Sequence, residues 1–543
     1  MSHGATIDAG IFEYVINNHR WAFCLILLPI SAAFDAWLKL KHVYTFWTRE
    51  RAPAKHKERV AEVQRQVRVW AESGAKGTMC TARPGWQTMS LRIGKYKATS
   101  RNIKIDLFDI LEVDTVNKCV RVEPMVTMGQ LTAAINPLGW TLPVVPELDD
   151  LTIGGLIAGV GVETSSHIYG LFQHICREFE VVLADASVVT CSATQRPDLF
   201  YNVPWSHGTL GFVVSATIQM VPCKPYVRLR YVPCHSKAAA LALFDAEARK
   251  GRGRREAEEN GLRNGPQNGG AKGEGDSAWA SDFVEALAYS PSKYVVMLGD
   301  MVDEAEVQQD KINKIGLYWK EWFFLHVAKF LSLPEGSKPA VEYIPLRHYY
   351  HRHTRSLFWE IQEIIPFGNE PWFRWTLGWM MPPKPSMLKL TQTETLRQLY
   401  EKHHVVQDML VPMTDLDESL SVFDREFNIY PLWLCPMRIP RPPGHTGLVA
   451  PPKGSDDDLF VDIGGYGNPK TAGFEARASC RRVEDFVRSK HGFQMMYADT
   501  YMTREEFREM FDHAEYDRLR AALAHTQQGF PEIYDKVCKS NRI

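Results

Sequence analysis

Short runs of branched apolar residues alternate with turn-forming residues along the first half of the chain, between Cys80 and Val221. Runs of this length and composition are typical of β-strands. We expect strands within Ile103 to Phe108, Cys119 to Val126, Glu180 to Leu183, Ser187 to Cys191 and Gly211 to Val221. The segment VVLADASVVTC (181–191) predicts a hairpin that turns at 184–187. MGQLTAAINPLGW (128–140) has helical spacing directly after a strand, so the predicted class is mixed, α+β.

One long apolar run, Trp21 to Leu38, precedes this region. As a helix it would rise about 27 Å, just short of a typical hydrocarbon core. Pro29 and Asp35 interrupt the run, and a tryptophan stands near each end, as interfacial anchors do. We therefore predict a membrane-anchoring helix within residues 1–44, either single-pass or monotopic. A buried N-terminal helix is the alternative.

The charges around this run predict its orientation. No small-residue cleavage site follows it, so we expect the run to be retained. The flank that follows is far more basic than the one that precedes, with Lys39, Lys41, Arg49, Arg51, Lys55, Lys57 and Arg59. By the positive-inside rule, we expect the bulk of the chain in the cytosol. Residues 51–66 are charged with helical spacing and predict a connector that lifts the body off the membrane.

The second half contains two contrasting kinds of segment. Residues 248–278 are dominated by Gly, Asn, Arg and Glu, with almost nothing to fill a core, and predict a disordered surface insertion. Residues 315–333 are amphipathic and aromatic, and residues 357–383 concentrate four tryptophans, Trp359, Trp372, Trp375 and Trp379. Such segments form either ordinary core or an apolar pocket mouth or membrane-resting surface, and both interpretations stay open.

Composition narrows the function classes. At 543 residues the chain is too long for one core, and two or three domains are expected. A net charge of −1 without a basic patch argues against nucleic-acid binding. The ten cysteines show neither CxxC nor metal-ligand spacing. We therefore expect free thiols in a reducing compartment and no metal site.

The segment TIGGLIAGVGVET, Thr152 to Thr164, carries the strongest chemical signal. Its four glycines stand at 154, 155, 159 and 161, among small and branched residues. Glycine lets backbone N–H groups approach an anion, which favours a ligand with a pyrophosphate. The residue order does not match the G-x-G-x-x-G fingerprint of Rossmann folds, and no Walker lysine is present. The segment therefore predicts a dinucleotide site of another type.

Several motifs resemble, in the expected order, the FAD-binding domain of the vanillyl-alcohol-oxidase and p-cresol methylhydroxylase (PCMH) type. They are RPGW (83–86), VRVEPMVTMGQL (120–131), TIGGLIAGVGVE, YG (169–170), VVLADAS and GTLGFVVSATIQM (208–220). The resemblance implies an FAD-binding domain of two small α+β subdomains and an α/β cap domain over the flavin ring. We place the FAD-binding domain at 45–225, the cap or substrate domain at 226–495, and a C-terminal segment that returns to the flavin at 496–543.

A closer resemblance covers nearly the whole chain. Segments similar to the delta(24)-sterol reductase family, of the Diminuto/Dwarf type, are MCTARPGWQTMSLRIGKYK, VPELDDLTIGG, SSHIYGLFQHIC, EYIPLRHYYHRHTRS, KLTQTETLRQLYEKHHVVQDMLVP, HGFQMMYADTYMTREEF and EIYDKVCK. The 248–278 insertion departs from the family pattern, as does Ala186, where an LADGS turn usually has Gly. The resemblance implies NADPH-dependent reduction of the Δ24 double bond of sterols such as desmosterol, with FAD as the hydride relay, at the endoplasmic reticulum membrane.

The resemblance also transfers FAD binding onto particular residues. They are Thr152, Ile153, Gly154, Gly155, Leu156, Ile157, Ala158, Gly159, Val160, Gly161, Val162, Glu163 and Thr164. Arg83, in the loop upstream, is expected to meet the pyrophosphate or the flavin. Some members of the broader family link FAD to a histidine of that loop, but TARPGWQTMS (81–90) contains none. We therefore expect non-covalent FAD, with His167 the only histidine near the second loop.

The implied reaction requires a proton donor. An isolated alkene has no carbonyl to make it electrophilic, so hydride addition needs a proton delivered to the other alkene carbon in a dry pocket. Positive charge prefers the tertiary carbon, which sends the hydride to C25 and the proton to C24. The candidates for the donor are Tyr497, Tyr501, His351 and His353. If the segment 342–355 is a strand, the two histidines share one face and Arg352 lies on the other.

Two other functions are compatible with the same fold. One is an FAD oxidase or dehydrogenase of a small alcohol or aldonolactone, against which the aromatic second half and the apolar N-terminal run argue. The other is a non-catalytic sterol-binding scaffold, against which the intact glycine segment argues. The partners we consider are a sterol, the endoplasmic reticulum membrane and other enzymes of sterol biosynthesis, but no nucleic acid.

Overall fold

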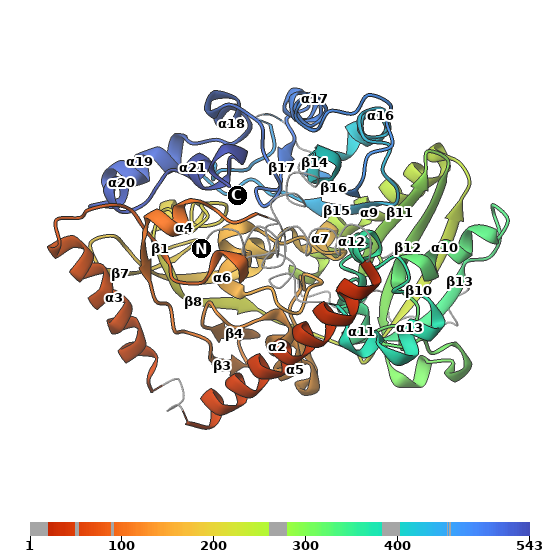
Figure 1. The fold of residues 1–543 in the computed structure, drawn as a ribbon, viewed down its shortest axis with the longest axis horizontal. Helices are drawn as coiled ribbons and strands as arrows, with labels where there is room; N and C mark the ends of the chain where they lie inside the picture. The colour runs from red at the N-terminus through yellow and green to blue at the C-terminus, as the bar shows by residue number, and fades with distance from the viewer. Residues whose placement is uncertain are drawn as a thin grey trace, which may run out of the picture.

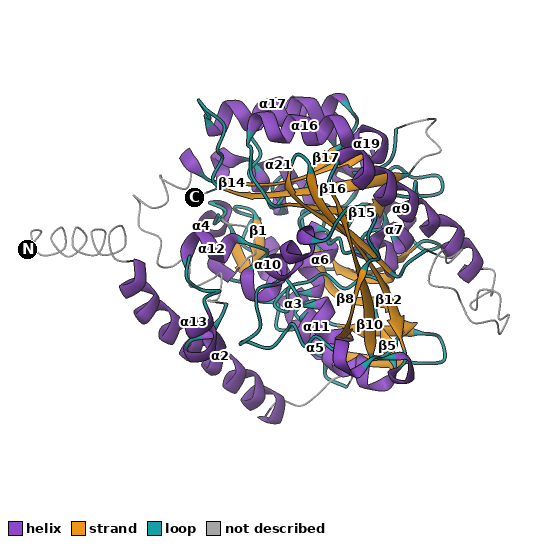
Figure 2. Cartoon of the chain, turned by 90° about the vertical axis from the view of Figure 1, so that its right-hand side faces the viewer, coloured by secondary structure: helices purple, strands orange, loops and turns teal. Residues whose placement is uncertain are grey.

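Two antiparallel sheets organise the chain (Figures 1 and 2). The computed structural model describes residues 20–48, 54–87, 92–259, 280–382, 402–452, 454 and 458–542. The smaller sheet has the strand order β3-β4-β8-β6-β7 and lies in the N-terminal half. The larger sheet has the order β13-β10-β12-β11-β15-β16-β14-β17. The predicted mixed α and β class is confirmed.

The smaller sheet forms where the sequence predicts short alternating strands. Its strands are β3 (Ile110–Asp114), β4 (Cys119–Val122), β6 (Cys176–Val182), β7 (Val188–Ser192) and β8 (Phe212–Gln219). The predicted hairpin is confirmed, because β6 pairs antiparallel with β7 and Val182 lies opposite Val188. Ala186, in its turn, has a φ of +66°, a left-handed conformation that glycine adopts with less strain.

Short elements complete this domain. β1 (Met79–Thr81) pairs in parallel with β2 (Arg101–Ile103), and β5 (Trp140–Thr141) pairs with β9 (Val221–Pro222). Helix α5 (Met128–Ile135) begins where predicted, behind a capping box of Thr127 and Gln130. The other helices are α4 (Tyr96–Thr99), α6 (Ile153–Gly159), α7 (Ser166–Tyr169) and α8 (Pro197–Phe200). The strand predicted over 103–108 is wrong beyond Ile103, because the chain leaves the β1–β2 pair there.

The larger sheet is antiparallel throughout and forms the core of the second domain. Its strands are β10 (Tyr226–Cys234), β11 (Phe283–Ser290), β12 (Lys293–Val302), β13 (Ala340–Pro345), β14 (Val405–Pro412), β15 (Leu432–Arg438), β16 (Leu459–Gly467) and β17 (Phe493–Gln494). Helix α9 (Lys237–Glu259) packs against β11 and β12, and α17 (Ala476–Ser489) packs against β14 and β17 beside α16 (Leu416–Glu426). Every residue of β15 and β16 is buried.

The aromatic segments divide between core and surface. Within residues 315–333, α10 (Phe323–Ala328) is the α-helical part. The next segment forms α11 (Leu346–Tyr350), α12 (Glu360–Ile364), α13 (Pro371–Thr376) and the 3₁₀ turn η8 (Gly378–Met380). Trp359 is buried, whereas Trp372, Trp375 and Trp379 are between 56 and 63 % exposed. Both interpretations of the tryptophans therefore apply, each to different residues.

The C-terminal segment returns to the first domain. It contains α18 (Arg504–Met510), α19 (Ala514–Ala522), α20 (Thr526–Gly529) and α21 (Ile533–Val537). Figure 1 shows these helices in blue, and Lys536 of α21 lies over the ring of Tyr96 in α4. Arg542 forms a β-bridge with Gly94, and Arg520 donates a hydrogen bond to the carbonyl of Thr209. The last residues of the chain are therefore part of the wall of the first domain.

The N-terminal helices differ from the expectation. Helix α2 (Arg20–Thr48) covers the apolar run, but no helix among the described residues is both long and apolar enough to cross a membrane. The membrane-anchoring helix is thus not confirmed, and residues 1–19 of the predicted anchor lie outside the described residues. Helix α3 (His56–Glu72) forms where the connector is predicted, but it packs on the smaller sheet, with Val63, Val67 and Trp70 buried. It is part of the first domain, not a free spacer.

The predicted disordered insertion is wrong at its start. Residues 248–259 are the last turns of α9, and residues 260–279 lie outside the described residues. Ala248 is buried, and Gly251 lies so close to His167 that a Cβ would meet the carbonyl oxygen of that residue. Arg254 pairs with Asp282. Small residues and paired arginines therefore pack this segment, although its composition resembles that of a solvated loop.

Candidate active site

A cavity of about 580 Å³ is lined by residues from both domains. The first domain contributes the glycine segment and its upstream loop. The larger sheet contributes Gln407, Trp433, Asp462 and Tyr466, and the C-terminal segment contributes Tyr497, Tyr501, Lys536 and Arg542. This volume lies within the range of cofactor and ligand pockets in proteins. Segments far apart in the sequence therefore meet at one cavity.

Most of the predicted cofactor-binding residues line this cavity. They are Arg83, Thr152, Gly154, Gly155, Leu156, Ala158, Gly159, Val160, Gly161 and Val162. The other four are buried but not part of its lining: Ile153, Ile157, Glu163 and Thr164. This division between cavity and core is expected, because the segment begins with helix α6 and only one side of a helix can face a ligand.

The glycines of the segment serve two different purposes. A Cβ on Gly154 would lie 2.7 Å from Cβ of Pro124, and one on Gly161 would lie 2.8 Å from Cδ2 of Leu156. These two glycines permit close packing within the protein. A Cβ on Gly155 would meet only Oγ1 of Thr152, at 3.0 Å, and one on Gly159 has nothing closer than 3.8 Å. Those two positions leave the backbone open to a ligand.

Cationic side chains line the cavity near the glycines. Arg83 donates from Nη1 to Oγ1 of Thr152 at 3.0 Å, while its buried Nε has no partner among the described residues. Lys536 donates to the backbone carbonyl of His207, and burial together with the nearby charge of Lys97 lowers its pKa to about 8. Buried cations with spare donor capacity are costly unless an anion completes them. The pyrophosphate of a flavin dinucleotide fits this wall.

The larger sheet contributes an aromatic and acidic wall. Asp408 accepts a hydrogen bond from the hydroxyl of Tyr466 at 2.5 Å and another from Tyr497. Burial raises the pKa of Asp408 to about 6, although both hydroxyl groups oppose this effect. Burial and then Asp408 raise the pKa of Tyr497 well above its usual value. Tyr497 and Tyr501, two of the predicted proton donors, both line the cavity, and a donor must reach the substrate there.

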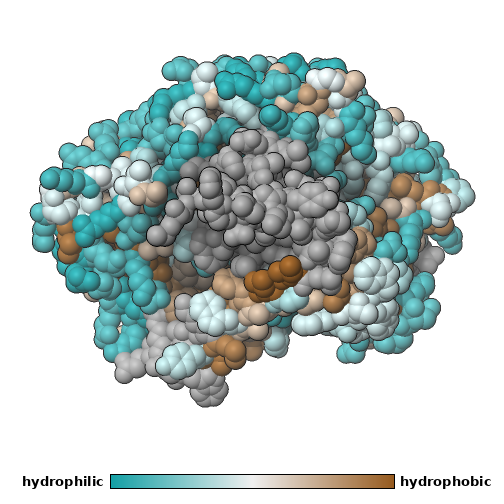
Figure 3. Space-filling view, viewed as in Figure 1, coloured by the Kyte–Doolittle hydropathy of each residue, from teal (hydrophilic) through white to brown (hydrophobic). Residues whose placement is uncertain are grey.

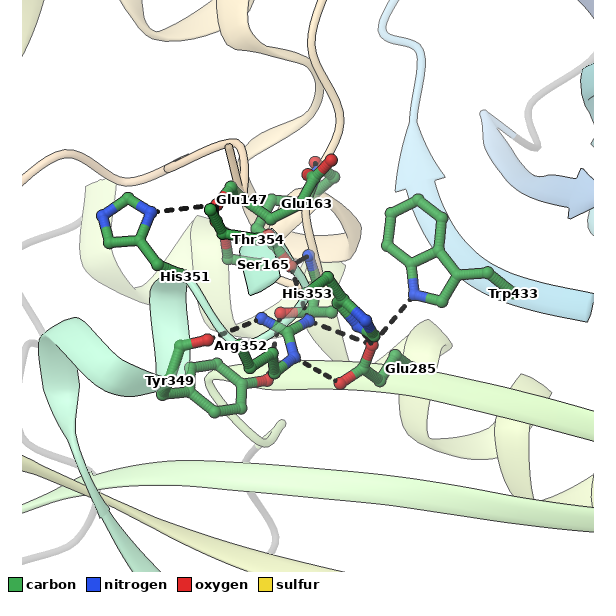
Figure 4. A network of polar contacts seen from close by, with 12 residues as sticks. Glu147, Glu163, Ser165, Glu285, Tyr349, His351, Arg352, His353, Thr354 and Trp433 are labelled. Carbon is green, nitrogen blue, oxygen red and sulfur yellow. Dashed lines mark hydrogen bonds and ion pairs between the residues drawn. The ribbon is translucent and has the colours of Figure 1, made fainter. Parts of the chain in front are cut away.

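The two candidate histidines lie elsewhere (Figure 4). Their segment is not the alternating strand that we considered, because β13 ends at Pro345 and a turn follows α11. His351 donates from Nδ1 to the carbonyl of Glu147 at 2.9 Å, and His353 stacks on Phe358. Burial lowers the pKa of His353 to about 4, so it is neutral at pH 7. Neither histidine is part of the cavity lining.

Arg352 holds a buried network rather than a solvated face (Figure 4). Its guanidinium donates to Glu285 at 2.9 and 3.0 Å and to Oε1 of Glu163 at 3.0 Å. Trp433 donates from Nε1 to the same Glu285 at 2.9 Å. Glu163 belongs to the glycine segment, whereas Glu285 and Trp433 belong to the larger sheet. The network thus links the two domains directly behind the cavity wall.

Several cavity residues were missed by the sequence reasoning. Asp462 is a single acid within the apolar run LFVDIGGYG, a pattern that could have revealed it. Glu147 lies in the PELDD stretch just before the glycine segment. Burial and then the charge of Glu163 raise the pKa of Glu147 to about 8. Lys536 and Arg542 gave no signal, because nothing in their local sequence distinguishes them from surface cations.

Other predicted features concern thiols, metals and the flavin linkage. The nine cysteines whose side chains are described are all free, as expected. No group of three or more potential metal ligands is present among the described residues. His167 is buried and its ring nitrogens contact the carbonyls of Thr164 and Ser281, so it does not line the cavity. Non-covalent FAD binding stays a prediction.

Comparisons with known proteins agree with this geometry. Residues 58–192 match the FAD binding domain family. The chain is 53 % identical to delta(24)-sterol reductase of Homo sapiens, over 98 % of this chain and 95 % of that one. It is 41 % identical to the delta(24)-sterol reductase homolog of Caenorhabditis elegans, over 98 % and 96 %. It is 37 % identical to delta(24)-sterol reductase of Arabidopsis thaliana, over 92 % and 88 %. This chain belongs to the delta(24)-sterol reductase family of FAD-binding proteins.

Proposed function

We propose that this chain reduces the Δ24 double bond of sterol intermediates, from desmosterol-like to cholesterol-like, with FAD as cofactor and NADPH as reductant. The observation that carries the proposal is the identity to delta(24)-sterol reductases over nearly the whole chain. The cavity supports it, since its lining combines cationic and glycine-rich residues with an aromatic cluster in which the rings of Phe358 and Trp433 lie 5.1 Å apart. Such an aromatic surface suits a sterol side chain.

Residues of this chain would bind both molecules and exclude water. FAD, when bound, supplies the transfer of a hydride from NADPH to the sterol. Gly155 and Gly159 would leave room for the pyrophosphate, and Arg83 and Lys536 would neutralise its charge. The aromatic residues of the cavity lining would hold the alkene away from water. A proton from the protein can then reach C24, with the hydride directed to C25.

A small alcohol or aldonolactone fits this cavity less well. Such a substrate is polar and compact, whereas the lining from Leu357, Ile364, Val405 and Val406 is apolar. A non-catalytic scaffold has no use for a buried cationic wall beside the glycine segment. We therefore retain sterol reduction as the proposed function.

The test uses the full chain purified in detergent with its bound flavin. Under anaerobic conditions, NADPH should bleach the visible flavin absorption, and only a Δ24 sterol should restore it. Cholesterol, which lacks the double bond, is the matched control and should restore nothing. Rapid recovery in air without sterol would favour an oxidase. A colourless protein that gains no flavin from added FAD would overturn the proposal.

We also propose that the chain rests on the endoplasmic reticulum membrane with its catalytic body in the cytosol. Helix α2 exposes Ile26, Ile30, Leu40 and Val43, and it contacts η8. That contact places α2 beside the exposed tryptophans of α13 and η8, namely Trp372, Trp375 and Trp379. Figure 3 shows apolar side chains gathered on this side of the molecule. Tryptophan beside aliphatic residues suits the interface of one leaflet, which favours monotopic attachment.

Flotation with liposomes tests the membrane contact. Replacing both Trp375 and Trp379 by serine should lower the bound fraction several-fold, because each indole removes apolar area from water in the interface. Val188→Ser, on β7 of the smaller sheet, is the control and should bind like wild type. Equal binding of all three proteins would contradict this surface. Location of the tagged chain in cell fractions tests the compartment separately.

A further inference from the structure

Asp462 is a buried acid that forms no ion pair with any cation of the described residues. It lies near the centre of β16, is 1 % exposed and lines the cavity. Its Oδ1 is buried without a hydrogen-bond partner among the described residues. An ionised carboxylate in such a place would be very unfavourable, so the group holds its proton. Burial, Asp408 and Glu147 all raise its pKa well above the usual value.

The register of the sheet explains what surrounds this carboxyl. Asp462 lies opposite Cys435 of β15 and Leu410 of β14, neither of which brings a charge. Gly464 and Tyr466 are the next residues on the same face of β16, because side chains alternate along a strand. Tyr466 and Trp433 line the cavity together with Asp462. The acid therefore lies on the same face of the sheet as the aromatic residues Trp433 and Tyr466, which line the cavity with it.

The neighbouring Asp408, unlike Asp462, has a hydrogen-bond donor on each of its carboxyl oxygens. It accepts hydroxyl protons on both carboxyl oxygens, from Tyr466 and Tyr497, which favours its ionised form. Gly464 makes room for this pairing, since a Cβ there would lie 2.7 Å from the hydroxyl oxygen of Tyr466. Asp408 lies opposite Gly464, which makes it a diagonal neighbour of Asp462. Two acids on one face thus take different states, one charged and one protonated.

We propose that Asp462 is the catalytic residue that delivers the proton to C24 of the sterol, an inference that rests on the proposed function. The π bond between C24 and C25 breaks, and its electron pair forms the new C24–H bond with the proton of Asp462. The hydride that NADPH supplies through FAD forms the C25–H bond. Asp462 is left as a carboxylate and regains a proton from water before the next turnover.

Two other residues at the cavity are less suited to this role. Tyr497 already donates its hydroxyl proton to Asp408, so that proton points away from a substrate. Glu147 is also a raised-pKa acid at the cavity, but it precedes the glycine segment rather than standing between Trp433 and Tyr466. Its backbone carbonyl, moreover, accepts hydrogen bonds from His351 and Thr354. The choice between the two acids can be tested directly.

The experiment measures two steps separately in the holoenzyme, the reduction of its flavin by NADPH and the reoxidation of that flavin by the sterol. Asp462→Asn should keep its FAD and be reduced by NADPH at the wild-type rate. Its reoxidation by desmosterol should slow at least about a hundredfold, the usual size of an acid-catalysis effect. Asp462→Leu, which matches the apolar residues of β16, should behave alike and guards against a folding defect of the amide. Glu147→Gln tests the other acid of the cavity and should slow this step far less than Asp462→Asn.

A second readout does not depend on turnover. Infrared difference spectra of the oxidised holoenzyme, with and without desmosterol, should show a protonated-carboxyl band in wild type and Glu147→Gln that is missing in Asp462→Asn. Reoxidation of both Asp462 variants near the wild-type rate would overturn the inference, as would a loss confined to Glu147→Gln. If wild type itself is not reoxidised by the Δ24 sterol, the proposed function fails instead, which distinguishes the two outcomes.

Discussion

Neighbouring residues of the cavity wall differ in what a single substitution would do. Gly154 and Gly155 are consecutive in α6, yet a side chain on the first would collide with Pro124, whereas one on the second would enter the cavity. Arg83 and Lys536 differ from surface cations because both are partly buried and line the cavity beside the site proposed for the pyrophosphate. At this scale, the surroundings of a residue decide its role more than its type.

Gly155→Val should remove FAD while the fold persists. The branched side chain would occupy the space beside Thr152 that the ligand needs. We expect the flavin content of the purified protein, measured from its visible absorption, to fall at least about tenfold. Gly253→Val, on an open face of α9 with nothing within 4 Å, is the control and should retain its flavin. Full flavin content in Gly155→Val would contradict the assignment of this backbone to the cofactor.

Lys536→Met should weaken FAD binding and remove a pH dependence. Because the pKa of Lys536 is lowered to about 8 in the protein without ligand, its charge is lost as pH rises from 7 to 9. FAD affinity of wild type, measured by fluorescence quenching, should therefore fall over this range, and that of the variant should be lower and flat. Lys57→Met, on the exposed side of α3, is the control, and its FAD affinity should depend on pH as that of wild type does.

The same lysine affects stability with a defined sign. The unfolded chain binds more protons at Lys536 between pH 8 and its ordinary pKa of 10.5, so this residue makes the free energy of unfolding rise with pH in that window. The apoprotein of wild type should gain stability relative to Lys536→Met from pH 8 to 10, measured by urea unfolding. A constant difference across this range would show that the pKa of Lys536 is not lowered in the folded protein.

At the scale of elements, α3 is attached to the smaller sheet by a buried ionic network. His56 contacts Oε1 of Glu123 at 2.8 Å, and Arg59 donates to Oε2 of the same carboxylate at 2.9 Å. Burial lowers the pKa of His56, but its contacts with Glu123 and Glu180 outweigh this effect and raise it above 6.5. An amphipathic pattern predicts that a helix forms here, but the network determines where it docks.

Glu123→Gln should loosen α3 from the sheet. Removing the charge takes from His56 and Arg59 the fully buried carboxylate that they share and leaves them only the half-buried Glu180 and Asp109, which costs up to about 3 kcal/mol of unfolding free energy. The histidine contribution is present below pH 6.5 and is lost as pH rises through its raised pKa. The destabilisation, measured by urea unfolding of the holoenzyme, should therefore be larger at pH 6 than at pH 9. Glu62→Gln, which breaks an exposed pair with Arg65, should change it by less than about 1 kcal/mol.

At the scale of the whole molecule, the cavity exists only because the two domains are held together. Arg352 makes that connection, since it pairs at once with Glu163 of the glycine segment and Glu285 of the larger sheet. All three side chains are essentially inaccessible to water. The C-terminal segment adds a second connection by placing Tyr497 and Lys536 in the same wall.

Arg352→Met should destabilise the protein and loosen the cofactor site together. Two buried carboxyls would lose their cation, at a cost of about 3–5 kcal/mol. We expect a lower thermal midpoint and faster loss of FAD on dilution. Arg347→Met, five residues earlier on the exposed side of α11, should show neither effect. Adding Glu285→Gln to Arg352→Met should restore part of the stability, and no recovery would mean that the pair is not the cause.

The sequence by itself was sufficient for the local elements and for the cofactor segment. Alternating apolar runs predicted the β6–β7 hairpin, and spacing predicted α5, because both signals act between residues close in the chain. The glycines at 154–161 marked a pyrophosphate site for the same reason. Composition predicted a disordered insertion at 248–259, and this prediction was wrong. These residues are the end of a helix, and long-range contacts such as the pair of Arg254 with Asp282 hold them in place.

Only the tertiary structure decided which titratable groups meet at the cavity. His351 and His353 looked like proton donors in the sequence, but a turn carries them behind the wall and burial keeps His353 neutral. Asp462 looked like one acid in an apolar strand, and pairing with β14 and β15 placed it at the cavity, away from every cation that the described part of the chain could pair with it. A pKa depends on what surrounds a group in space, and those surroundings come from four distant segments. The sequence therefore predicted which segment binds the dinucleotide, and the fold determined which acid can hold a proton at the cavity that this segment lines.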